Sequence, residues 1–144
     1  FDSTMAIASA NTVTGTLRLI GCLVTMSSAG YINANASTSV IELYNTKVNA
    51  SASTGPGINM SANATLITRG GLIDGKNGGG NAALNITTPV TVNCIGTYFK
   101  GDTGLAVQAD AAFSNAPFFH CVFEGGVTNV TCLAGTANGS SISF

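Results

Sequence analysis

One short stretch decides the fold of this chain: Gly71-Leu72-Ile73-Asp74-Gly75, in which an inward-facing apolar residue is followed two positions later by a small one. Related stretches occur at Cys22-Leu23-Val24-Thr25-Met26, Thr46-Lys47-Val48-Asn49-Ala50, Thr97-Tyr98-Phe99-Lys100-Gly101 and Cys121-Val122-Phe123-Glu124-Gly125. Their apolar centres are Val24, Val48, Ile73, Phe99 and Phe123, which are 24, 25, 26 and 24 residues apart. The chain therefore carries a sequence repeat with a period of about 25 residues.

Each repeat contains two further apolar segments. One follows the centre after a turn, at Tyr31-Ile32, Ile58-Asn59-Met60, Leu84-Asn85-Ile86, Leu105-Ala106-Val107 and Val130-Thr131-Cys132. The other precedes the centre, at residues 17–20, 40–43, 66–67, 90–92 and 118–119. Three short strands per period, joined at Gly, Asn and Ser corners, predict an all-β fold in which each repeat is one coil of a parallel β-helix.

Other repeat and all-β architectures fit this pattern less well. Leucine-rich repeats need a recurring Leu/Asn scaffold and a helical segment, propeller blades need about 40 residues, and an immunoglobulin-like sandwich does not repeat a strand triplet. The fourth repeat has an imperfect register, because Cys94 aligns with Cys22 and Cys121 whereas Phe99 aligns with Phe123. We interpret Ile95-Gly96 as a bulge or corner insertion, which a solenoid tolerates.

The chain has 144 residues, enough for one sizeable core, and we expect one β-helix domain over residues 1–144. We assign residues 1–15 to an N-terminal cap or arm, 16–134 to about five to six coils, and 135–144 to a C-terminal tail or cap. Coils stacked at the strand spacing give a column roughly 25–30 Å tall. Neither terminal segment has an amphipathic helical period, so we expect other chains to cover at least one end or one lateral face.

Composition limits the classes of partner. The formal net charge is −1 and only 8% of residues are charged, with five Lys and Arg in total. Because nucleic acids and anionic membranes attract proteins through basic patches, we expect neither as a partner. No apolar run is long enough to span a membrane, no signal-peptide pattern is visible, and the chain opens at Phe1, through processing or trimming.

Motifs such as Val92-Asn93-Cys94-Ile95 and Phe119-His120-Cys121-Val122-Phe123, set among Gly, Ala, Thr and Asn, cover nearly the whole chain. In architecture and composition the chain resembles the right-handed parallel β-helix proteins of bacteriophage particles: tailspikes, fibre modules and capsid decoration or cement proteins. That resemblance implies a homotrimer on the virion surface, assembled in the host cytoplasm. Enzymatic tailspikes are several times longer, so the small size favours a decoration or attachment module.

The repeat places three charged residues at equivalent positions of successive coils: Asp74, Lys100 and Glu124. We expect a surface ladder of alternating charge, with neighbours about 5 Å apart and the two carboxylates about 10 Å apart. The positive charge of the intervening lysine favours the ionised form of both carboxylates. A general acid needs the opposite, a carboxyl group with a raised pKa. We therefore interpret the ladder as structural and expect no catalytic residues, no enzyme activity and no cofactor.

His120 is the only histidine, and it lies directly beside Cys121. Adjacent strand residues point to opposite faces, so we expect Cys121 inside, His120 outside, and no nucleophile–base pair between them. Cys22 and Cys121 are four coils apart, and only Cys94 and Cys121 could form a disulfide easily. No C-x-x-C spacing indicates zinc, so buried free thiols in a reducing compartment fit best.

Residues 70–76 match G-x-x-x-x-G-K as a string, but Asn77 replaces the Ser or Thr of a nucleotide loop and further glycines follow. We interpret this segment as a glycine-rich corner and candidate contact loop. Its members are Gly75, Lys76, Asn77 and Asn81. Candidate apolar anchors of an interface are Phe113, Phe118, Ile142 and Phe144, of which Phe113 and Phe118 fit a core position equally well.

Seven N-x-[ST] triplets occur, beginning at Asn35, Asn49, Asn59, Asn63, Asn85, Asn129 and Asn138. Glycosylation at these sites requires a secretory pathway, and it would favour a eukaryotic or surface-exposed glycoprotein. Within strands, the triplets at Asn85 and Asn129 have a simpler interpretation as outward positions in an alternating pattern.

These features bear on four candidate functions. The leading hypothesis is a homotrimeric capsid decoration or cement protein, whose partners are its own copies and a major capsid protein. The alternative is a receptor- or glycan-binding module of a tail fibre, spike or cell-surface adhesin, with Tyr31, Tyr44 and Tyr98 to stack on sugars. A polysaccharide-cleaving enzyme is disfavoured by six dispersed carboxylates, and an ice-binding solenoid by the lack of regular Thr-x-Thr columns.

Overall fold

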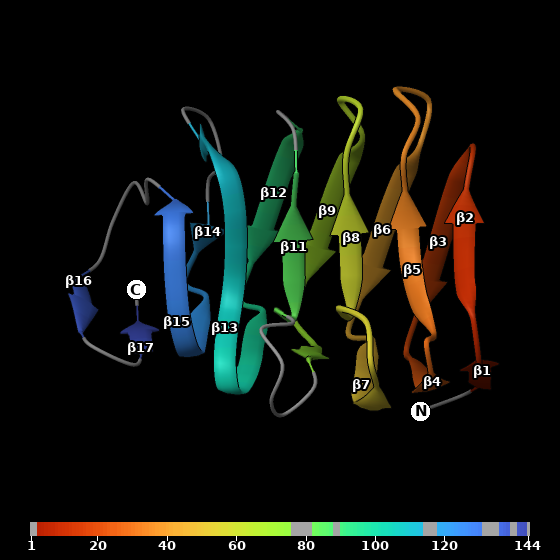
Figure 1. The fold of residues 1–144 in the computed structure, drawn as a ribbon, viewed down its shortest axis with the longest axis horizontal. Coiled ribbons are helices and arrows are strands. Elements are labelled where there is room, and N and C mark those ends of the chain that lie inside the picture. Colours follow the sequence, from red (N-terminus) through yellow and green to blue (C-terminus); the bar gives the residue numbers. More distant parts are fainter. Residues whose placement is uncertain are drawn as a thin grey trace.

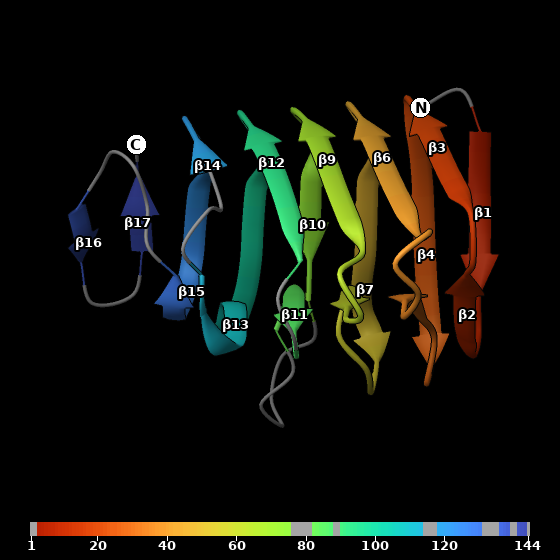
Figure 2. The same ribbon diagram turned by 90° about the horizontal axis from the view of Figure 1, so that it is seen from above.

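The computed structural model describes residues 3–75, 82–87, 90–113, 118–130, 136–138 and 141–143. These residues form a parallel β-solenoid of about four turns with a period of about 24 residues and without a helix. Three parallel sheets run along it (Figures 1 and 2). The predicted all-β parallel β-helix is therefore confirmed, with slightly fewer complete turns than expected.

Each coil contributes one strand to each of the three sheets. Sheet 1 contains β1 (Ser3–Ile7), β4 (Cys22–Ser28), β7 (Lys47–Ser53), β10 (Leu72–Asp74) and the first parts of β13 (Tyr98–Phe113) and β15 (Val122–Val130). Sheet 2 contains β2 (Ala10–Val13), β5 (Tyr31–Ala34), β8 (Ile58–Met60), β11 (Leu84–Ile86) and the later parts of β13 and β15. Sheet 3 contains β3 (Thr16–Ile20), β6 (Val40–Tyr44), β9 (Thr65–Arg69), β12 (Thr91–Ile95) and β14 (Phe118–Phe119).

The register of sheet 1 matches the sequence repeat residue by residue. Val24 pairs with Val48, Val48 with Ile73, Ile73 with Phe99 and Phe99 with Phe123. Met5 extends the same column by one strand at the N-terminal end. The predicted repeat centres therefore form one continuous inward column.

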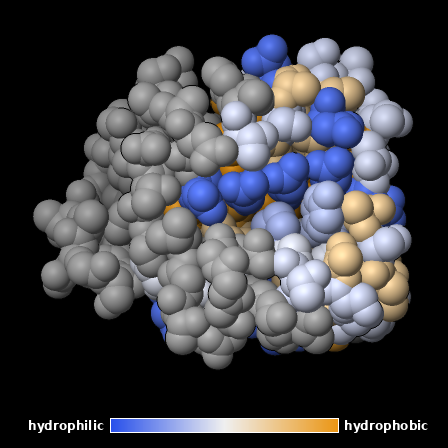
Figure 3. All heavy atoms as spheres, in the orientation of Figure 1, coloured by the Kyte–Doolittle hydropathy of each residue, from blue (hydrophilic) through white to orange (hydrophobic). Residues whose placement is uncertain are grey.

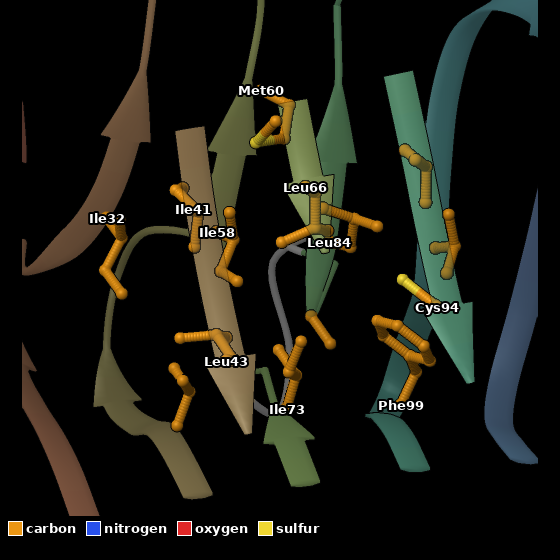
Figure 4. Packing of buried hydrophobic residues seen from close by; sticks show 14 of the residues in the cluster. Ile32, Ile41, Leu43, Ile58, Met60, Leu66, Ile73, Leu84, Cys94 and Phe99 are labelled. Atoms are coloured by element: carbon orange, nitrogen blue, oxygen red, sulfur yellow. The ribbon is translucent and has the colours of Figure 1, made fainter. Parts of the chain in front are cut away.

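Apolar side chains from all three sheets fill the interior. In Figure 4 the labelled residues of β5, β6, β8 to β13 project into the space between the sheets. Near the C-terminal end, the Phe99 ring stacks on Phe123 with centroids 5.3 Å apart, and the Phe118 ring lies edge-on to Phe99 at 5.6 Å. Thr68 and Thr97 are also buried, and their hydroxyl oxygens are 2.7 Å apart, so a hydrogen bond joins these two polar groups.

The corner between sheets 3 and 1 is built identically in every coil. Gly21, Asn45, Gly70, Gly96 and His120 occupy this corner, and all have positive φ, between 46° and 64°. The N–H groups of the first four donate to the carbonyl of the next coil, at 2.8–2.9 Å. A residue that tolerates the left-handed conformation is therefore required once per period.

This corner corrects the interpretation of the fourth repeat. Ile95 pairs with Arg69 and Phe119 as an ordinary strand residue, and Gly96 is the regular corner residue. Cys94 pairs with Thr68 and Phe118, so Thr97, not Cys94, occupies the position of Cys22 and Cys121. The predicted bulge at Ile95-Gly96 is therefore wrong, because it followed from aligning Cys94 with Cys22 and Cys121. The irregular registers lie elsewhere, between β4 and β7 and between β13 and β15.

The two ends of the solenoid differ from the expected segments. Residues 1–15, expected as a cap or arm, include β1 and β2, which pair in parallel with β4 and β5. The described parts of 135–144 form β16 (Thr136–Asn138) and β17 (Ser141–Ser143), an antiparallel pair of which β17 lies antiparallel to β15. Among the described residues, stacking is present from Ser3 onward, and the parallel pairing of sheet 1 ends at β15.

The corner supplies a test of the fold. In Gly96→Ala, a Cβ would meet nothing within 4 Å, so only the left-handed backbone is penalised, and we expect a loss of about 1 kcal/mol in the free energy of unfolding. In Gly71→Ala, the Cβ would lie 2.3 Å from the Thr46 carbonyl oxygen, and we expect a clearly larger loss. Gly96→Asn is the matched control with little loss, because Asn45 already holds this conformation. Urea unfolding measures all three, and equal stabilities for Gly96→Ala and Gly71→Ala would contradict the corner geometry.

Candidate functional site

The outward side chains form columns, because each coil repeats the register of the one before it. The column of sheet 1 that contains the charged residues runs Thr25, Asn49, Asp74, Lys100, Glu124. Lys100 is thus the register partner of both Asp74 and Glu124, as the sequence analysis placed it. Asp74 and Lys100 are half-buried, whereas Glu124 is exposed.

Glu124 has a partner that the sequence analysis missed. The Tyr98 hydroxyl donates a hydrogen bond to Glu124 Oε2 across neighbouring strands. This bond is the main cause that raises the pKa of Tyr98, because the neighbouring carboxylate disfavours a tyrosinate. Glu124 lies two residues beyond Val122, the register partner of Tyr98, so the bond runs diagonally between the two strands.

A second charged contact lies on sheet 3. The Arg18 guanidinium donates to Glu42 Oε2, its register partner 24 residues away. This hydrogen bond lowers the pKa of Glu42 and raises that of Arg18. Because the pair lies on the surface, it orders the two side chains without adding much to stability.

Sheet 2 carries an amide column. Its outward register runs Thr12, Asn33, Asn59, Asn85, Gln108. Asn59 Nδ2 donates to Asn33 Oδ1 at 2.9 Å, and Asn85 Nδ2 donates to Asn59 Oδ1 at 2.7 Å. A row of hydrophilic residues crosses this face in Figure 3. The amides of Asn59 and Asn85, which begin two of the N-x-[ST] triplets, are therefore engaged with one another.

Two further outward columns frame the corner between sheets 3 and 1. On the sheet 3 side the column is Ile20, Tyr44, Arg69, Ile95, Phe119. On the sheet 1 side it is Leu23, Lys47, Leu72, Tyr98, Val122. We call these ten residues the corner strip. The large hydrophobic side chains that are exposed among the described residues, Ile20, Ile95, Phe119 and Val122, all belong to it.

For the predicted interface anchors, the structure decides between the two interpretations of Phe118. Phe118 is fully buried and packs against Phe99 and Phe123, so it belongs to the core and not to a surface. Its neighbour Phe119 is the exposed residue, at 40%. Ile142 lies in β17 opposite Phe123 in the backbone register. The side chains of Phe113 and Ile142, and all of Phe144, lie outside what the structure describes.

The predicted contact loop also needs correction. Gly75 is buried, and a Cβ there would lie 2.6 Å from the Ala83 nitrogen. It therefore packs against the backbone of Ala83, directly before β11 of the same coil, instead of facing a partner. Lys76, Asn77 and Asn81 lie outside the described residues.

Cys121 lies inside and His120 outside, as predicted, although both belong to the corner between β14 and β15 and not to a strand. Cys22 is half-buried, whereas buried thiols were predicted. Cys121 is fully buried, and His120 is exposed at the corner. Cys22, Cys94 and Cys121 are free thiols. Burial is the main cause that raises the pKa of Cys94. Among the described residues, no three His, Cys, Asp or Glu side chains are grouped as metal ligands.

A cavity of about 290 Å³ lies at the N-terminal end of the solenoid. Its lining includes Met5, Val13 and Leu17, inward-facing residues of the first coil that remain only partly buried, and the buried Ile32 of the second. The cavity is thus the uncovered end of the core. The lining contains Asn, Thr and Gly besides apolar residues, with no ionisable group to act on a ligand.

No family model, curated protein or solved structure matches the chain. The part of the chain that the structure describes contains no helix able to cross a membrane.

The amide column can be tested by removing its middle member. Asn59→Ala loses one donated and one accepted bond, and we expect a loss of about 1–2 kcal/mol in the free energy of unfolding. Asn35→Ala, at an exposed turn position of the preceding coil, is the control and should change stability little. Chemical denaturation compares the two, and equal effects would contradict the hydrogen-bonded column.

Burial predicts distinct reactivities for the thiols. In a Cys132→Ser background, we expect the half-buried Cys22 to react with the thiol reagent DTNB in the native protein, because its side chain reaches the surface. Cys94 and Cys121, which are fully buried, should react only after unfolding. Absorbance counts the thiols released before and after denaturant is added. Rapid native labelling of all three would contradict the packed interior.

Proposed function

We propose that this chain is a structural protein that works by adhesion, and that it is a homotrimeric decoration or cement protein of a bacteriophage capsid. The observation that carries the proposal is the column organisation of the outer faces. The strands form a continuously hydrogen-bonded frame on which two outward columns of the described residues carry no charge: the amide column of sheet 2 and, on sheet 3, the column Thr16, Val40, Thr65, Thr91. Such a frame presents a fixed, extended surface to a partner.

Neutral faces suit adhesion for an energetic reason. Burial of a charged group against a partner requires a compensating charge, whereas Thr and Asn need only ordinary hydrogen bonds and Ala needs none. A trimer multiplies each contact by three, so weak contacts act together with high avidity. In the proposed mechanism, the chain adheres through many weak contacts spread over a large interface. The partner is a major capsid protein, and the location is the virion surface.

The proposal also holds that the chain is not an enzyme. Asp74 and Glu124 are separated by the Lys100 strand, about 10 Å at the strand spacing, and Glu124 accepts the Tyr98 hydrogen bond. Inverting glycosidases place their carboxyl groups roughly 6.5–9.5 Å apart and retaining ones about 5 Å apart. The ladder thus lacks the spacing for either mechanism.

Fractionation of particles tests the proposal. A tagged chain is expressed during particle assembly, and full particles, tail-less shells and free tails are separated on a density gradient. We expect the chain on full particles and shells and not on free tails. Recovery on tails alone would instead favour a fibre or spike module, and recovery on none of the three would overturn the assignment to the virion.

A further inference from the structure

We draw no further inference here: the strongest candidate, the partly apolar corner strip along the bend between sheets 3 and 1, is interrupted by Tyr44, Lys47 and Arg69, and nothing in the structure shows what covers it.

Discussion

The structure depends on one backbone constraint, the left-handed corner that turns the chain from sheet 3 into sheet 1 once per coil. At this corner an N–H of one coil reaches a carbonyl of the next, so the ladder of parallel hydrogen bonds continues around the bend. A left-handed residue costs little only for glycine and, less favourably, for asparagine or a similar side chain. Gly21, Asn45, Gly70, Gly96 and His120 meet this requirement, and their spacing sets the period.

The corner also determines what the surface looks like. A constant corner fixes the register of every strand, and a fixed register sends alternate residues of all coils into the same inward or outward column. The core columns, the amide column of sheet 2 and the corner strip are three results of that register. Apolar side chains on the strip lie beside the corner because the flanking positions point outward on both sides of it. The same constraint that builds the frame thus concentrates its exposed apolar surface on one ridge.

The repeat, the strand triplet and the inward column could be predicted from sequence, because Val24, Val48, Ile73, Phe99 and Phe123 share a spacing that needs no side-chain detail. The apolar residues exposed at the surface could not be predicted in the same way. Phe118 and Phe119 are adjacent and chemically identical, and only strand parity, fixed by the pairing of Cys94 with Phe118, places one inside and the other outside. The error at Ile95-Gly96 also concerns register. The cysteines do not occupy equivalent positions in every coil, whereas the left-handed corner residues do. The hydrogen bond from Tyr98 to Glu124 was missed because it crosses between adjacent strands diagonally and not along a column.

Amide hydrogen exchange at the corner tests the central claim most directly. If the left-handed corners are hydrogen-bonded parts of the ladder, the N–H groups of Asn45, Gly70 and Gly96 exchange as slowly as those of the neighbouring strands in the folded protein. NMR spectra recorded after transfer into D₂O resolve these amides individually. Exchange of the three corner amides within seconds, beside protected strands, would show that the corners are open loops and would contradict the account.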